Sequence, residues 1–400
     1  MQRTERLAAQ DHPPRGPLGP QGHRELLAVA GVAAVVVVVT VMSALLLPVR
    51  AGSPDLLPGR PWWEGWVNWD SGWYRGIALH GYSYVLGQQG PVAFFPLYPL
   101  LMRLGSGVVG SVTGPGIVVT LASGVAAALL LARWFRERLS PEAAWTALLL
   151  FLLYPYAFYL FGPVYADATF LVAVVGSFMA LERGHPWLAG LIGVAATAAR
   201  PLGAVLVVGL VVRTLERRGV VDGGADAGWR RRLGRLRPAD GGVLLAAAGV
   251  GGYAFYLWHR FGDPLAFLTV QEAWGQQQDA ATWFKFDFFR ETARFDSPNA
   301  VILLAAHAVV TVIALALLPR VVKRFGWGYG IYAILIVGVP ALSTKNFFGM
   351  GRYLLLAFPC FAVAAELLAG RARLRAWTLT GSGLAMVAAA SYSARAYYVS

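Results

Sequence analysis

The segment over residues 62–85 sets one acidic side chain, Asp70, among regularly spaced aromatic residues. It reads WWEGWVNWDSGWYRGIALHGYSYV, with tryptophans at positions 62, 66, 69 and 73. A recurrence every three or four residues predicts one continuous helix face, and an aromatic face opposite a charged one is typical of a helix in the membrane interface. Asp70 is then either a solvated acid on that helix or a catalytic base, held where a lipid-linked substrate presents its reacting group. Tyr74, one turn further on, is a neighbouring candidate for substrate binding.

A second acid and two arginines stand near the ends of apolar runs. Arg200, in AARPLG, lies between two such runs, where an unpaired arginine costs several kcal/mol. It either pairs with Asp167, in GPVYADATF, or binds a lipid phosphate through its planar guanidinium. Asp167 itself either meets water at the end of a span or faces the helix bundle in a functional role. Arg352, in FFGMGRYLLLAFP, either clamps a phosphate or extends from a helix end to the interface.

Three further side chains are weaker candidates for substrate binding. His80, in LHGY, either hydrogen-bonds a substrate hydroxyl or phosphate or is a non-catalytic interfacial histidine. Lys345 is a lesser candidate for the phosphate. Trp274 lies in the run VQEAWGQQQD at 270–279, and such mixtures of aromatics, amides and acids occur both in sugar-binding sites and in interfacial belts.

Motifs for a metal or a nucleotide are absent from the sequence. It contains no GxxxxGK[ST] phosphate loop, no HExxH pair and no cluster of Cys and His. Asp70 has no DxD partner, because position 68 is Asn and position 72 is Gly. We therefore expect no cofactor, and a required divalent metal is disfavoured.

The composition indicates a membrane protein. Of the 400 residues, 57% are hydrophobic and 14% are charged, and the mean hydropathy is +0.55. A soluble domain carries about 25% charged residues. The net charge of +13 sits in short clusters between apolar stretches, which argues against nucleic acid as a partner and for the lipid bilayer. The single cysteine, Cys360, lies in an apolar run and is interpreted as a plain buried or lipid-facing thiol.

Eleven apolar runs are candidate membrane spans. They cover residues 26–48, 113–133, 142–161, 163–182, 185–200, 201–216, 241–261, 299–319, 327–343, 352–370 and 376–397. The short pair split by Arg200 is either two spans or a broken hairpin. Segment 94–110 is interrupted by prolines, and we interpret it as an outer juxtamembrane helix.

The arginine clusters orient these spans. With the N-terminus in the cytoplasm, every cluster falls inside, and an odd number of spans puts the C-terminus outside. We predict a multi-pass protein of the cell membrane, with a disordered cytoplasmic tail over 1–24 and a single transmembrane domain over 25–400. Its outer loops are expected at about 49–112 and 262–298, and a basic cytoplasmic loop at about 217–240.

Five segments resemble the PIG-V family, the GPI mannosyltransferase 2 type, and in particular its bacterial members. They are NWDSGWYRGIALHGY at 68–82, AFFPLYPLL at 93–101, VYADATF at 164–170, ARPLG at 199–203 and FFRETARFDSPNAVILLA at 288–305. They occur in the family's order and are spread over most of the chain. The resemblance implies an all-α polytopic GT-C fold, here with about 11 transmembrane helices and interfacial helices in the long first outer loop. It also implies a polyprenyl-phosphate sugar donor, a site on the outer face, and Asp70 as the match to the family's acid.

These observations favour an inverting mannosyltransferase that uses polyprenyl-phosphate-mannose and a glycolipid or glycan acceptor. Asp70 would take the proton from the acceptor hydroxyl. Arg352 and Arg200, with His80 or Lys345 as lesser candidates, would stabilise the leaving phosphate. The first alternative is a transporter or flippase of lipid-linked sugars, which would use the same cavity without chemistry. The second is a non-enzymatic scaffold of a cell-envelope assembly.

Overall fold

The protein is helical throughout the part of the chain that is described. The computed structural model describes residues 20–59, 61–221, 229–274, 276, 279–292 and 298–399. Within these ranges the only β-structure is an isolated bridge between Gln276 and Thr344. The N-terminal tail predicted over 1–24 falls largely outside the described residues.

Every predicted span coincides with a helix or with a broken helix. In chain order these are α2 (Pro20–Leu46), α5 (Thr113–Arg136), α6 (Pro141–Leu152) with η3 (Ala157–Leu160), α7 (Asp167–Glu182), α8 (Pro186–Ala199), α9 (Gly203–Arg217), η4 (Pro238–Ala247) with α11 (Ala248–Phe261), α15 (Pro298–Phe325), α16 (Trp327–Ser343), α17 (Met350–Leu355) with α18 (Phe358–Leu368), and α19 (Ala372–Ala394).

Four of these helices are long and apolar enough to cross a membrane, and they are α2, α5, the continuous helix over Pro238–Phe261, and α15 over Val301–Phe325. Among the described residues, five shorter apolar helices accompany them, and they are α4 (Leu97–Val109), α6, α8, α16 and α18. The predicted class, an all-α polytopic membrane protein, is thereby confirmed. The number of crossings and the orientation in the membrane remain predictions.

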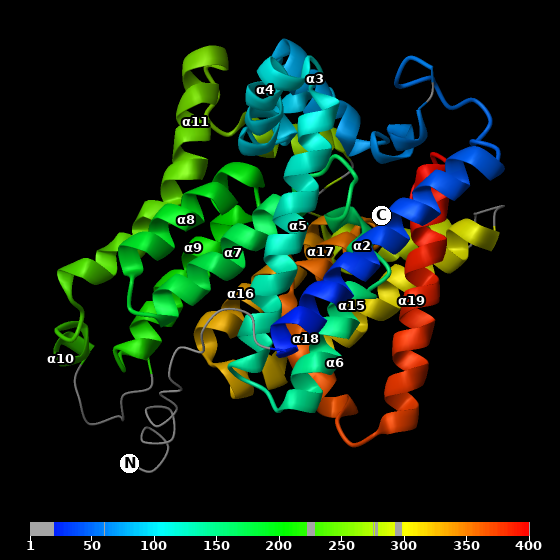
Figure 1. The fold of residues 1–400 in the computed structure, drawn as a ribbon. Helices are drawn as coiled ribbons and strands as arrows, with labels where there is room; N and C mark the ends of the chain where they lie inside the picture. Colours follow the sequence, from blue (N-terminus) through cyan, green and yellow to red (C-terminus); the bar gives the residue numbers. More distant parts are fainter. Residues whose placement is uncertain are drawn as a thin grey trace.

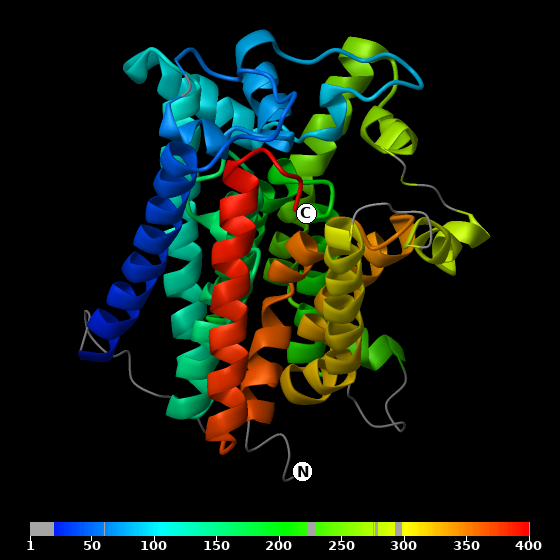
Figure 2. The same ribbon diagram turned by 90° about the vertical axis from the view of Figure 1, so that its right-hand side faces the viewer.

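The segments predicted as outer loops fold into short helices. The first contains η1 (Trp62–Trp66), α3 (Asp70–His80), η2 (Pro91–Ala93) and α4 (Leu97–Val109). The second contains α12 (Ala266–Thr269), η5 (Val270–Trp274), α13 (Ala280–Trp283) and α14 (Phe286–Thr292), and the basic loop contains α10 (Trp229–Leu233). In both ribbon views α3 and α4 cap one end of the bundle, while the turn between α18 and α19 lies at the other (Figures 1 and 2).

The first helix starts earlier than the sequence predicted. The predicted tail ran to residue 24, yet α2 begins at Pro20. Residues 20–24 are therefore helical and continuous with the apolar part of α2. Close to this start, Glu25 lies 3.1 Å from Arg136 of α5, which connects the first turns of α2 to a neighbouring helix.

The pair split by Arg200 forms a short helical hairpin. The helices α8 and α9 have 14 and 15 residues, so each is roughly 21–23 Å long, less than the roughly 30 Å of a bilayer core. Arg200 is extended, with φ −153° and ψ 151°, because the proline that follows disfavours a helical backbone before it. Close packing of α8 on η4 depends on Gly190, where an added Cβ would lie 2.0 Å from the carbonyl oxygen of Gly242.

Several arginines gather around carboxylates at the end of the bundle away from α3. Glu182, at the last residue of α7, lies 2.7 Å from Arg213, 3.5 Å from Arg138 and 3.7 Å from Arg217. Arg324 pairs with Glu366 at 2.9 Å, which adds α15 and α18 to the same end. Since α7 is roughly 24 Å long, its two ends place Asp167 and Glu182 at opposite ends of the bundle.

Replacing Glu182 by Gln tests this network. The variant leaves three arginines without their shared carboxylate. We therefore expect the unfolding free energy to fall by about 2 kcal/mol, which lies between the values for breaking a buried and an exposed ion pair. Thermal unfolding in detergent measures it. Glu142→Gln is the control, because Glu142 pairs only with Arg375 among the ion pairs described and its side chain is 51% exposed. Equal losses in the two variants would contradict a special role for Glu182.

Candidate active site

One large cavity lies under the cap formed by the outer segments. Its volume is about 820 Å³. It is bounded by α3, the turn after η2, the Arg200 turn, η5, the loop over residues 344–349, α17 and the end of the chain. Predicted site residues from four separate parts of the sequence line it, namely Asp70, Tyr74, Arg200, Trp274, Lys345 and Arg352.

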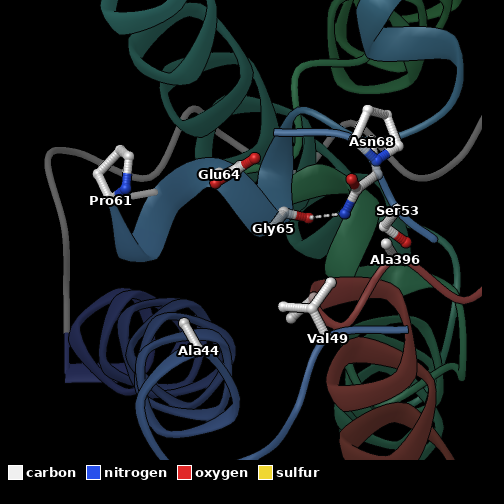
Figure 3. A pocket seen from close by; sticks show the side chains of 10 residues that line it. Ala44, Val49, Ser53, Pro61, Glu64, Gly65, Asn68 and Ala396 are labelled. Carbon is white, nitrogen blue, oxygen red and sulfur yellow. Dashed lines mark hydrogen bonds between the residues drawn. The ribbon is translucent and has the colours of Figure 1, made fainter. Parts of the chain in front are cut away.

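A strained turn places Asp70 at the cavity. The predicted continuous helix through the tryptophans is wrong, because η1 ends at Trp66 and α3 begins at Asp70. Between them Trp69 has φ 60°, a left-handed backbone that a bulky residue seldom adopts. The turn is held by Asn68, whose Nδ2 donates to the carbonyl oxygens of Gly65 (3.2 Å) and Ser393 (3.1 Å). Figure 3 shows the first of these bonds, beside a second, smaller cavity of about 80 Å³.

This turn also determines the electrostatics of Asp70. As the first residue of α3, Asp70 stands at the positive end of the helix dipole, which stabilises a carboxylate. Its Oδ2 lies 2.7 Å from a terminal guanidinium nitrogen of Arg352. The carboxylate side chain is 19% exposed, so it is accessible from the cavity while paired.

Asp167 lies beneath Asp70 and connects both arginines. Its Oδ1 accepts a hydrogen bond from Arg200 and is 3.9 Å from Nε of Arg352. Asp167 and Arg200 are 1% and 6% exposed. Four ionised groups therefore alternate in sign in the order Asp70, Arg352, Asp167, Arg200, which offsets the cost of removing each from water. Arg200 thus pairs with Asp167, as one of the two alternatives predicted, and it also lines the cavity.

Aromatic rings hold both guanidinium groups in place. Arg352 lies over Tyr165 (5.0 Å to the ring centre), and Arg200 lies over Tyr353 (5.4 Å). The turn that carries Arg352 requires glycine at 351, since an added Cβ there would approach the Tyr156 ring to 2.1 Å. Packing thus fixes the direction of both arginines before any ligand binds.

One wall of the cavity combines aromatic rings with amides. Trp73 stacks on Phe94 with ring centres 5.8 Å apart, and Trp274 meets Trp73 edge-on at 5.5 Å. The amide side chains of Gln89, Gln271 and Gln276 line the same cavity. Such a wall offers flat apolar faces together with hydrogen-bond donors and acceptors.

The cavity phenol of Tyr74 is protonated at physiological pH, as a tyrosine with its ordinary pKa would be. Desolvation raises the pKa of Tyr74 further above its ordinary value. This side chain can therefore donate a hydrogen bond within the cavity.

The structure does not bring every predicted residue to the cavity. His80 is exposed at the last residue of α3, ten residues and therefore roughly 15 Å along the helix from Asp70. It does not line the cavity, so the structure does not bring it together with the other predicted residues. Gln277 and Gln278, next to Trp274, lie outside the described residues.

Several lining residues were not predicted, among them Gln89, Asn346, Tyr353 and Tyr398. Tyr353 follows a predicted site residue directly, which is a signal that the sequence did offer. Tyr398 stands in the run AYYVS after the last span and shows no such signal. Among the described residues, no group of three or more His, Cys, Asp or Glu side chains could hold a metal ion.

Lys285 also joins the cavity region without having been predicted. Its Nζ donates to the carbonyl oxygen of Thr344, and it lies 5.2 Å from the ring centre of Phe347. Burial lowers the pKa of Lys285 to about 8. The hydrogen bond from Lys285 to Thr344 connects the segment predicted as the second outer loop, residues 262–298, to the loop that carries Lys345.

Comparisons with known proteins give likenesses of fold. The sequence matches no protein-family model and no curated protein. In fold it is similar to the archaeal oligosaccharyltransferase AglB from Archaeoglobus fulgidus in complex with an inhibitory peptide and a dolichol-phosphate (TM-score 0.44, 14% identity, 92% of this chain and 55% of that chain). It is also similar to ArnT from Cupriavidus metallidurans bound to undecaprenyl phosphate (TM-score 0.48, 15% identity, 92% and 76%). A third likeness is to the Archaeoglobus fulgidus oligosaccharyltransferase in the apo form (TM-score 0.45, 14% identity, 93% and 56%). The chain thus spans about half the length of the two oligosaccharyltransferase chains.

The buried pair under the cavity predicts a compensating double variant. Asp167→Ala removes the carboxylate that pairs with the buried Arg200, so we expect the unfolding free energy to fall by about 3–5 kcal/mol. Adding Arg200→Leu removes the unpaired charge and should restore most of that loss. Thermal unfolding of the three variants measures the coupling. Strictly additive losses would contradict the pairing.

The pKa of Lys285 predicts a rise of stability with pH. Between about pH 8 and its ordinary pKa of 10.5, the unfolded lysine still holds a proton that the folded one has lost, so stability increases with pH. The unfolding temperature of wild type minus that of Lys285→Met should therefore increase from about pH 7 to about pH 9.5. Lys323→Met, at an exposed position, is the control. A difference that shrinks over this range would contradict the assignment.

Proposed function

We propose that the protein is an inverting glycosyltransferase that takes a sugar from a polyprenyl-phosphate donor on the extracytoplasmic face. The single observation that carries the proposal is the Asp70–Arg352 pair at the cavity, because it sets a base beside a phosphate-binding cation. The PIG-V resemblance adds mannose as the sugar and a lipid-linked or cell-envelope acceptor. It also adds the GT-C fold type.

The charges around the cavity suit an anionic group such as a phosphodiester. Arg200, Arg352 and Lys345 carry three positive charges, and Asp70 and the buried Asp167 carry two negative ones. Lys285, on the Thr344 carbonyl, adds a further positive charge below its pKa of about 8, so the net charge is positive. A sugar joined to a polyprenyl chain through phosphate carries one negative charge at neutral pH. Arg352 has five N–H donors, so it can bind a phosphate oxygen while part of its fork still contacts Asp70.

The reaction then needs only groups that this chain supplies. The acceptor hydroxyl gives its proton to the carboxylate of Asp70, and its oxygen forms a bond to the anomeric carbon. The bond from that carbon to the phosphate oxygen breaks, and its electron pair leaves with the polyprenyl phosphate. Arg352 and Arg200 stabilise the negative charge that grows on the phosphate in the transition state. Because the attack and the departure occur on opposite faces, the configuration inverts.

The aromatic and amide wall supplies a surface for sugar rings. Trp73, Phe94 and Trp274 present ring faces and edges, and Gln271 and Gln276 present amides at the same cavity. The cavity lies at the end of the bundle opposite Glu182 and its arginines. Under the predicted orientation, with arginine clusters in the cytoplasm, this end faces the outside of the cell.

Asp70→Asn tests the proposed base. The amide cannot accept the proton, so we expect kcat for sugar transfer to fall by about 10²–10⁴-fold while binding of undecaprenyl phosphate is kept. Purified protein in nanodiscs with radiolabelled polyprenyl-phosphate-mannose provides the measurement. Glu64→Gln is the matched control, because Glu64 is an acid of the same loop that binds the backbone N–H of Leu56 and does not line the large cavity.

The outcome also separates the rival hypotheses. Near-normal transfer by Asp70→Asn would remove Asp70 as the base. Translocation of the labelled lipid across proteoliposomes without sugar transfer would favour the transporter or flippase. Silent substitutions at both Asp70 and Arg352 would favour the scaffold.

A further inference from the structure

The end of the chain folds back into the cavity. After α19 the chain turns at Ala396, which has φ 62°, and residues 396–399 form what we call the C-terminal strap. Figure 2 shows this turn leading from the top of α19 toward the middle of the molecule. The strap is anchored just before the turn, where the Arg395 carbonyl accepts from the N–H of Arg50 (3.0 Å) and Arg395 Nε donates to the carbonyl of Pro48 (2.9 Å).

One strap residue, Tyr398, touches both segments that carry the Asp70–Arg352 pair. Its ring meets Trp69 edge-on with centres 4.9 Å apart, and stacks on Phe348 with centres 4.8 Å apart and planes at 5°. Trp69 directly precedes Asp70, and Phe348 lies four residues before Arg352. A single ring therefore contacts the side chain of the residue before the acid and the side chain of a residue one helical turn before the arginine.

Backbone strain is concentrated around this ring. Among the described residues, four non-glycine residues have positive φ, and they are Trp69 (60°), Lys285 (57°), Phe347 (64°) and Ala396 (62°). Trp69 contacts Tyr398, Phe347 precedes its stacking partner, Ala396 starts its strap, and Lys285 lies over Phe347. Such conformations persist only where surrounding contacts hold them, and they cluster at functional sites.

We propose that Tyr398 is a positioning residue for the Asp70–Arg352 pair. Its ring fixes the strained Trp69 turn against the Phe348 loop, so that the carboxylate and the guanidinium meet at the cavity with the spacing that phosphate binding and proton transfer need. The inference rests on the proposed function for what the pair does, but not for how the pair is held.

The neighbouring tyrosine provides a matched control. Tyr397 does not line the cavity, and its ring lies near Tyr392 (5.5 Å) and Arg395 (5.3 Å). Tyr398→Phe is the conservative rescue, because the contacts with Trp69 and Phe348 are made by the ring. Tyr398→Leu removes the ring but fills more of its space than alanine does. It replaces Tyr398→Ala as the test variant if the alanine variant does not fold.

The experiment measures the Kd for undecaprenyl phosphate in nanodiscs, with thermal unfolding as a check on folding. We expect Tyr398→Ala and Tyr398→Leu to raise the Kd about tenfold, the effect of losing about one aromatic pair. Tyr398→Phe and Tyr397→Ala should stay within about twofold. In an Arg352→Lys background, Tyr398→Ala should add less than about twofold, because the two changes disturb one interaction.

Each outcome decides the proposal. Equal effects of Tyr397→Ala and Tyr398→Ala would show a general role in folding and overturn it, as would an unchanged Kd in Tyr398→Ala. Losses that multiply in the Arg352→Lys background would show that Tyr398 binds the lipid directly and not through the arginine. Should wild type bind the lipid phosphate but transfer no sugar, the proposed function fails while the Kd series still tests Tyr398.

Discussion

The row of alternating charges formed by Asp70, Arg352, Asp167 and Arg200 is the interaction on which the rest of the site depends. Removing an ion from water costs several kcal/mol, and the cost is offset only where an opposite charge lies close. The four groups come from α3, α17, α7 and the turn between α8 and α9. Helix ends from distant parts of the chain must therefore meet at the same level of the bundle. The helices that carry these four groups accordingly begin or end at the cavity.

Both acids in this row begin a helix. Asp70 is the first residue of α3 and Asp167 the first residue of α7, so each carboxylate has the positive end of a helix dipole behind it as well as an arginine in front. The two arginines, by contrast, are held from the side by the rings of Tyr165 and Tyr353. The result is a rigid charged floor with a net positive charge once Lys345 is included, under walls that are mainly aromatic and amide. This combination suits a substrate that is part sugar and part anionic phosphate.

Two clusters of charged residues lie at opposite ends of the helix bundle. At the end away from the cavity, Glu182 gathers arginines from α9 and from the chain just after α5 into a network. Arg138 lies over the Trp134 ring there, and Arg213 over the Tyr329 ring. Between the two ends, α7 packs through apolar contacts such as the stack of Phe178 on Tyr329, with ring centres 4.6 Å apart. One helix thus connects a structural cluster of charges at one end to the candidate catalytic cluster at the other.

The sequence alone determined the helical class, the positions of the apolar helices and most of the candidate residues, because the length of an apolar run and an ion inside it are local properties. It identified Arg200 and Arg352 for this reason, since they stand between or at the end of apolar runs, and it identified Asp70 by the regularly spaced tryptophans around it. Only the tertiary structure decided which charge meets which, that Trp69 breaks the predicted helix, that His80 points elsewhere, and that Tyr398 and Lys285 reach the cavity region. Those outcomes depend on contacts between segments as far apart as Trp69 and Tyr398 and on a left-handed φ at a tryptophan, and residue spacing encodes neither.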